Sequence, residues 1–74
     1  MINGNLRNGG VEIGEVKYDV TVQEDGVWTN GRLWTSDDNH MKLALAAEDL
    51  FLDDHPIEIS GETHDDRSLT FMPR

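Results

Sequence analysis

The first half of the chain alternates between apolar and polar residues, the pattern of a β-strand with one buried face. From Val11 onward the sequence is rich in strand-forming residues, and Gly14 is expected to mark a bulge or bend. Tyr18, Val20 and Val22 then alternate with polar neighbours. We therefore predict a strand whose apolar side chains face a core.

Asp25-Gly26 follows this strand and is typical of a two-residue hairpin turn. The register that this turn sets places apolar residues opposite one another on one face, and both tryptophans beside Arg32 on the other. A three-residue turn over residues 24–26 mixes apolar with polar partners, and a turn at Asn30-Gly31 leaves much shorter strands, so we favour the first register. Its pairs are Lys17–Trp34, Tyr18–Leu33, Asp19–Arg32, Val20–Gly31, Thr21–Asn30, Val22–Thr29 and Gln23–Trp28.

Residues 38–52 carry the periodicity of an amphipathic helix. Residues 35–38 supply several N-cap candidates, and Pro56 cannot continue a helix. Two apolar stripes lie on opposite sides of the expected helix; the first should pack on the sheet and the second needs a cover. The first stripe is Leu43, Ala46, Ala47, Leu50 and Phe51, and the second is Met41, Leu45 and Leu52.

The end of the chain alternates again, which predicts two more strands around the polar loop 61–67. Ile57 and Ile59 precede this loop, and Leu69 and Phe71 follow it. The expected fold is therefore α+β: a small two-layer domain in which one helix packs on an antiparallel sheet of two hairpins, in ββαββ order.

This single α+β domain is expected to cover residues 11–74. Residues 1–10 are rich in Asn and Gly, which favours a flexible N-terminal segment. Ile2 and Leu6 would alternatively suit a short edge strand.

The charge of the chain is strongly negative and unevenly distributed. Its 74 residues include 15 Asp or Glu and 6 Lys or Arg, which gives a net charge of −9. Residues 37–66 contain ten of the acids and a single base, Lys42, whereas the remaining residues contain five of each. Such a stretch repels nucleic acid and anionic membranes, so the expected partner is a basic protein surface, for instance on a nucleic-acid-binding protein.

The chain contains no cysteine, which excludes disulfides, thiolate metal ligands and a cysteine nucleophile. Its first residues lack the charged and apolar regions of a signal peptide, and no apolar run has the length of a membrane span. These features favour a cytoplasmic protein.

Histidines lie beside pairs of aspartates in Asp37-Asp38-Asn39-His40, Asp53-Asp54-His55 and His64-Asp65-Asp66. Imidazole and carboxylate groups can bind divalent metals, but Asp is also favoured at caps and turns, and these spacings match no established metal motif. We therefore predict no metal site and no cofactor. The sequence also lacks a Gly-x-Ser-x-Gly elbow and a glycine-rich phosphate loop, so we predict no catalytic residues.

The leading hypothesis is a small, acidic, non-enzymatic interaction protein, an inhibitor of the anti-CRISPR or anti-restriction type. Its carboxylates would mimic nucleic-acid phosphates and block a basic groove of the partner. The acidic candidates are Asp37, Asp38, Glu48, Asp49, Asp53, Asp54, Asp65 and Asp66.

Two alternatives stay open. In the first, acidity serves only solubility, and apolar or aromatic residues mediate a protein interaction or a homodimer. The candidates for that role are Met41, Leu45, Leu52, Trp28, Arg32 and Trp34, unless the sheet face with both tryptophans is the one that packs under the helix. The second alternative is a divalent-metal or small-ligand binder.

Overall fold

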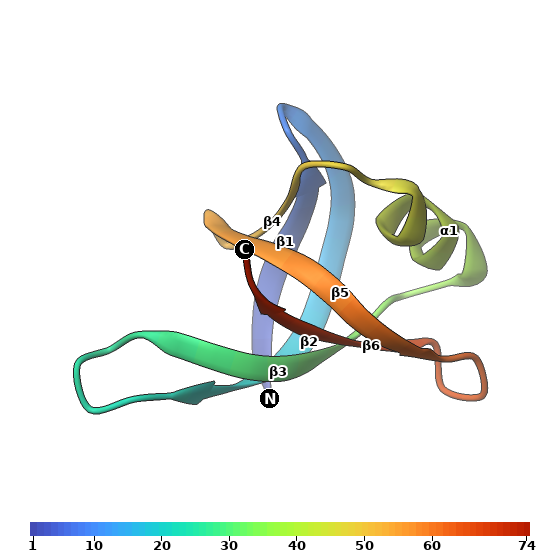
Figure 1. Cartoon of the computed structure of the whole chain (residues 1–74). Helices are drawn as coiled ribbons and strands as arrows, with labels where there is room; N and C mark the ends of the chain where they lie inside the picture. The colour runs from blue at the N-terminus through green and yellow to red at the C-terminus, as the bar shows by residue number, and fades with distance from the viewer.

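Six antiparallel strands form a closed barrel in the computed structural model, which describes residues 1–74 (Figure 1). Their order around the barrel is β1-β2-β3-β6-β5-β4, and pairing between β1 and β4 closes the wall. The strands are β1 (Ile2–Asn8), β2 (Val11–Val22), β3 (Trp28–Trp34), β4 (Leu50–Leu52), β5 (His55–Thr63) and β6 (Ser68–Pro73), and the helix is α1 (Asp38–Ala46).

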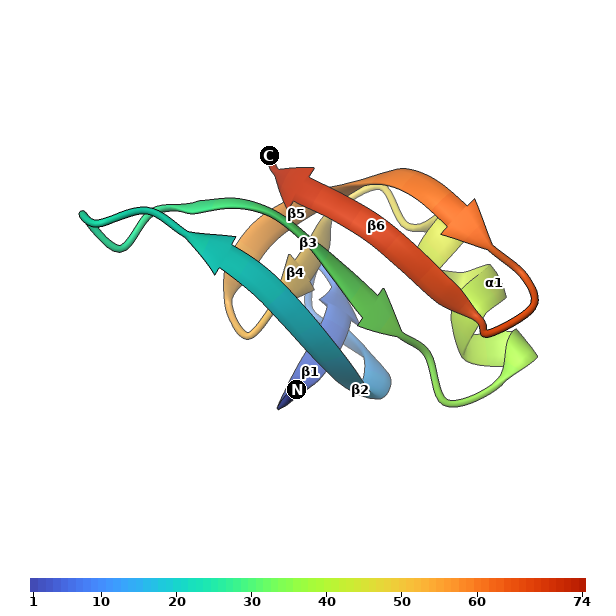
Figure 2. The same cartoon turned by 90° about the horizontal axis from the view of Figure 1, so that it is seen from below.

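The barrel consists of two three-stranded meanders that α1 connects. Strands β1 to β3 form the first and β4 to β6 the second, and the meanders meet where β3 pairs with β6 and β1 with β4. In both views α1 lies beside the β5–β6 turn, and the β2–β3 turn projects beyond the wall (Figures 1 and 2). The structure contains no helix with the length and hydropathy that a membrane crossing requires.

The prediction of a two-layer α+β domain in ββαββ order is wrong, because the sequence analysis did not identify β1 and β4 as barrel strands. Strand β1 occupies residues predicted as a flexible segment or a short edge strand, yet it pairs with β2 on one side and β4 on the other. Leu6 in this strand is fully buried. Gly9-Gly10 forms the two-residue connection to β2, since Asn8 pairs with Val11.

Strand β4 replaces the second half of the predicted helix. Helix α1 begins after its N-cap Asp37, as expected, but ends at Ala46, and Ala47 is already extended with ψ of 135°. Asp53 and Asp54 have φ of 48° and 67°, the left-handed values that a type I′ hairpin turn uses. The Asp53-Asp54 pair therefore turns β4 into β5 instead of ending a helix.

The shorter helix faces the core with a different side from the one predicted. Met41 and Ala44 are its buried residues, whereas Leu43 is 46% exposed and Leu45 is 40% exposed. Leu50 and Leu52 are buried as part of β4. Neither predicted helical stripe exists, because residues 47–52 leave the helix and follow strand geometry.

The body of the β2–β3 hairpin has the predicted register, which places Tyr18 and Leu33 on the core side. A register shift in the β1–β2 pairing opposite Gly14 also confirms the expected bulge. The confirmed pairs of the hairpin are Lys17–Trp34, Tyr18–Leu33, Asp19–Arg32 and Val20–Gly31.

The β2–β3 turn differs from the prediction. The Gln23 N–H donates to the Val27 carbonyl at 2.9 Å, so the turn contains the three residues 24–26, with Gly26 at φ of 84°. Val22 pairs with Trp28 rather than with Thr29. A bulge in β3, opposite the β2 segment between Val20 and Val22, absorbs the one-residue difference and brings Trp28 to the side of the sheet that carries Tyr18.

The two strands predicted around residues 61–67 are confirmed as β5 and β6, although the connecting loop is shorter. Strand β5 continues to Thr63, and Ile59 pairs with Phe71. Both strands contribute to one apolar core that fills the barrel. The core residues are Leu6, Ile13, Val16, Tyr18, Leu33, Met41, Ala44, Leu50, Leu52, Ile57, Leu69 and Phe71.

Candidate interaction surfaces

All eight predicted acidic residues are exposed, but Asp53 also has a structural role. Its Oδ1 accepts a hydrogen bond from the Asn5 N–H at 2.9 Å, and its Oδ2 accepts one from the Tyr18 hydroxyl at 2.8 Å. Burial and the hydrogen bond to Asp53 raise the pKa of Tyr18 to about 12. Asp53 therefore joins the β4–β5 turn to β1 and β2.

Asp49 and Asp54, on either side of β4, are neutralised by arginines. Asp54 pairs with Arg7 at 2.7 Å, and Asp49 pairs with Arg74 at 2.6 Å. Both guanidinium groups also lie 5.0 Å from the centre of the Phe51 ring, within cation–π distance. The acids around β4 therefore carry much less uncompensated charge than the sequence implied.

The fold brings Asp37 and Asp38 near Asp65 and Asp66, at the end of the barrel where α1 begins. The connection is Thr35, whose N–H and Oγ1 donate to the Arg67 carbonyl at 3.0 and 2.9 Å. The β5–β6 turn lies beside α1 in both views (Figures 1 and 2). Two acidic segments far apart in the sequence thus share one end of the molecule.

Two acids at this end accept hydrogen bonds from backbone N–H groups. Asp37 caps the helix by accepting from the His40 N–H at 2.8 Å, and Asp66 accepts from the Ser68 N–H at 3.1 Å. Hydrogen bonding from Ser68 lowers the pKa of Asp66. By contrast, Asp38, Glu48 and Asp65 make no side-chain hydrogen bond or ion pair within the chain.

The predicted row of Trp28, Arg32 and Trp34 is not a single surface. Trp28 packs against the core: its ring lies 5.6 Å from that of Tyr18 and stacks on His55 at 3.8 Å. The bulge in β3 is the reason, because it moves Trp28 to the opposite side of the sheet. Trp34 is half-buried and Arg32 is exposed.

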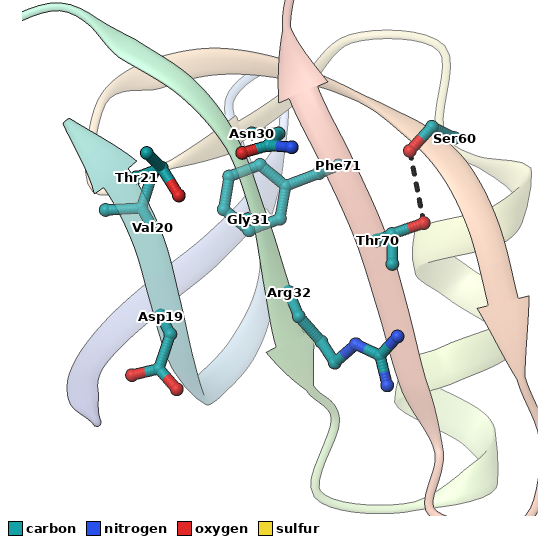
Figure 3. Close-up of a pocket in the computed structure, with 9 residues that line it drawn as sticks. All are labelled: Asp19, Val20, Thr21, Asn30, Gly31, Arg32, Ser60, Thr70 and Phe71. Carbon is teal, nitrogen blue, oxygen red and sulfur yellow. Dashed lines mark hydrogen bonds between the residues drawn. The ribbon is translucent and has the colours of Figure 1, made fainter. Parts of the chain in front are cut away.

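Arg32 borders a shallow depression of about 330 Å³ on the outer face of β2, β3, β5 and β6. Figure 3 shows its side chain extending from β3 across β6, with Asp19 on the neighbouring strand. A hydrogen bond of 3.1 Å from Ser60 to Thr70 lies on the far side. The depression contains one acid, one base and several hydroxyl or amide groups, so its surface is polar and carries no net charge.

The apolar alternative of Met41, Leu45 and Leu52 does not form a surface either. Met41 is 3% exposed and Leu52 is fully buried, so both belong to the barrel core. Leu45 alone is exposed, beside the shallow groove between α1 and His64.

Two of the three histidine–aspartate segments, residues 37–40 and 64–66, lie at the same end of the barrel, but no three side chains of His, Asp or Glu gather closely enough to hold a metal ion. His55 stacks on Trp28, and His64 lies 3.2 Å from Glu62. His40 hydrogen-bonds through Nδ1 to Ser36. Each imidazole therefore has a separate local partner.

A cleft that the sequence did not reveal lies between the first turn of α1 and the outer face of β1 and β2. Its volume is about 730 Å³. The Lys17–Trp34 pair was predicted, but the position of α1 beside it depends on the long-range closure of the barrel. The polar and aromatic side chains in its wall are Asn3, Glu15, Lys17, Trp34, Ser36 and His40.

No family model, curated protein or solved structure matches this chain. Its function is therefore inferred from its own residues.

Proposed function

We propose that this protein is a non-enzymatic interaction domain that binds a basic protein surface through its uncompensated carboxylates. A partner with a nucleic-acid-binding groove fits best, because carboxylates can replace phosphates against Lys and Arg side chains. The protein would then act as an inhibitor of the anti-CRISPR or anti-restriction type. We place the protein in the reducing cytoplasm, because its chain contains no cysteine and therefore no disulfide that an oxidising compartment would preserve.

One observation carries this proposal: the fold does not use all of its acidic side chains. Asp53, Asp37 and Asp66 bond to backbone or hydroxyl groups, and Asp49 and Asp54 pair with arginines. Asp38, Glu48 and Asp65 are exposed and have no such partner, although each adds to the self-repulsion of a chain with net charge −9. Glu12, Glu15, Glu24 and Glu58 are also exposed acids without such a partner, so the position of the acids must select among them.

The position of these acids supports a directed surface. Asp38 and Asp65 lie at the end of the barrel where α1 meets the β5–β6 turn, and Asp37 and Asp66 add negative charge beside them. A basic groove that approached this end would meet carboxylates from two segments at once. Electrostatic attraction of this kind accelerates association and weakens steeply with added salt.

The test uses purified CRISPR and restriction nucleases, with binding measured by calorimetry and DNA cleavage measured at increasing salt. The triple variant Asp38→Asn, Glu48→Gln, Asp65→Asn should lose inhibition. The matched control is Glu12→Gln, Glu24→Gln, Asp25→Asn, which removes the same charge from the first meander. Inhibition that resists salt, equal loss in both variants, or no binding across the panel would refute the proposal.

The homodimer alternative has less support than it had from the sequence, because Met41, Leu52 and Trp28 contribute to the core. The homodimer alternative can be tested by measuring the oligomeric state. A dimer found by light scattering at low protein concentration, and broken by Leu45→Glu, would favour self-association over the acidic surface.

A further inference from the structure

The cleft beside Trp34 has the size of a small-molecule site and a largely polar lining. Its volume of about 730 Å³ falls in the range of ligand pockets, and it is more than twice as large as the depression of Figure 3. Its walls come from three places: β1 and β2, the end of β3, and the segment that enters α1. Such a junction holds side chains from separate elements around one space.

An aromatic ring and an unpaired base lie next to each other in this cleft. Lys17 on β2 is directly opposite Trp34 on β3, and Trp34 is half-buried. Arg7 and Arg74 both form ion pairs with carboxylates, whereas Lys17 forms none, as is also true of Arg32, Lys42 and Arg67, even though the chain has 15 acids. A cation left unpaired in so acidic a protein, beside an aromatic face, can receive an anionic aromatic molecule.

The opposite wall supplies fixed hydrogen-bonding groups. Ser36 and His40 bond to each other, and Asp37 holds the backbone of His40 by capping the helix. The imidazole also fits closely against β2, since a Cβ on Gly14 would lie 2.8 Å from its Cε1. Gly14 adopts φ of 156° at the bulge, so the bulge in β2 and the position of this ring depend on the same residue.

We propose that this cleft binds a small aromatic carboxylate whose ring stacks on Trp34 and whose carboxylate pairs with Lys17. Ser36 and His40 hydrogen-bond to the ligand from the helix side. Glu15, on the same face of β2 as Lys17, accepts a hydrogen bond from an N–H or O–H on the ring and repels a second negative charge. Asp66 lies beside the Trp34 side chain, so the cleft adjoins the acidic end, but the contacts to this ligand involve none of Asp38, Glu48 and Asp65.

The test compares three probes that share one ring and differ in charge: indole-3-acetate, L-tryptophan and tryptamine. Binding is followed by the backbone amide shifts of the uniformly labelled protein, which also locate each probe. Indole-3-acetate should shift residues 15–17 and 34–40 and bind most tightly. Because the whole protein attracts cations, a preference for the anion must arise locally, from Lys17 or from hydrogen-bond donors of the cleft.

Two variants and one control define the contacts. Lys17→Met should weaken indole-3-acetate binding about tenfold and should not weaken tryptamine binding, since the attraction for the carboxylate and the repulsion of the ammonium are both lost. Trp34→Leu should weaken the binding of all three probes, because each of them stacks its ring on Trp34. Lys42→Met on α1 removes the same charge outside the cleft and should change nothing, and the unperturbed amide shifts of the barrel report that each variant is folded.

The proposal is overturned if no probe shifts the cleft amides at millimolar concentration, or if tryptamine binds most tightly. It is equally overturned if Lys17→Met leaves the preference for indole-3-acetate intact.

Discussion

Acidic residues around β4 and acidic residues at the start of α1 have different roles in this fold. Around β4, Asp53 bonds to Tyr18 and Asn5, and Asp49 and Asp54 pair with arginines. At the other end, Asp38 and Asp65 contact no such partner. The comparison shows that sequence charge is a poor guide to a functional surface until the acids that hold the fold together are identified.

Replacing Asp53 should cause the largest loss of stability. Asp53→Ala leaves the buried Tyr18 hydroxyl and the Asn5 N–H without their acceptor, and an unsatisfied group of this kind costs about 2 kcal/mol. Urea unfolding measures the change. The control is Asp54→Ala, which removes a neighbouring charge and should cost far less; equal losses would mean that charge rather than hydrogen bonding explains the effect.

The contact between Tyr18 and Asp53 should also make stability depend on alkaline pH. The folded state keeps Tyr18 neutral up to a pKa of about 12, whereas the unfolded chain ionises near the ordinary value of 10. The stabilisation that the neutral Tyr18 hydroxyl gives the folded state is therefore complete below pH 10 and is lost as the pH rises from 10 to about 12. Tyr18 is the single tyrosine, so tyrosinate absorbance reports this residue alone. The pH dependence should disappear in Tyr18→Phe; a titration near pH 10 in the folded protein would contradict the assignment.

Asp37 is the structural exception at the helix end. Asp37→Ala removes the N-cap bond to the His40 N–H and should lower the free energy of unfolding by about 1 kcal/mol. Asp38→Ala, one residue later, is the matched control because its side chain accepts no bond. Circular dichroism during thermal unfolding measures both, and equal destabilisation would mean that the cap is not what stabilises the helix.

The parts of the fold that could be predicted are those set by local pattern. The body of the β2–β3 hairpin, the start of α1, and strands β5 and β6 follow from alternation and capping. At the β2–β3 turn the less favoured three-residue geometry occurs, because the bulge in β3 between Trp28 and Gly31 compensates for the register change. A bulge cannot be inferred from pairing arguments that assume continuous strands.

The missing strands depend on contacts distant in the sequence. Leu50, Phe51 and Leu52 suit a helix and a strand equally well, and only pairing with β1 and β5 decides between them. Two signals were present: Gly9-Gly10 is a hairpin dipeptide, and Asp tolerates the left-handed values found at Asp53-Asp54. The structural roles of Asp49, Asp53 and Asp54 could not be predicted for the same reason, since they arise only when the barrel closes.

The ion pair between Arg7 and Asp54 should contribute a smaller amount. Both side chains are partly exposed, so Asp54→Asn should cost about 0.5 kcal/mol, and added salt should reduce the difference from the parent protein. Urea unfolding at low and high salt measures it. A loss as large as that of Asp53→Ala would remove the distinction between hydrogen-bonded and ion-paired acids around β4.

The smallest effect on stability should come from the acids assigned to a partner. Asp38→Asn combined with Asp65→Asn removes no contact of the fold and relieves repulsion in a chain of net charge −9, so the free energy of unfolding should stay within about 0.5 kcal/mol of the parent or rise. Binding to a basic partner should weaken at the same time. If this double variant were instead as unstable as Asp53→Ala, these two acids would also be structural, and the molecule would have no acidic end reserved for a partner.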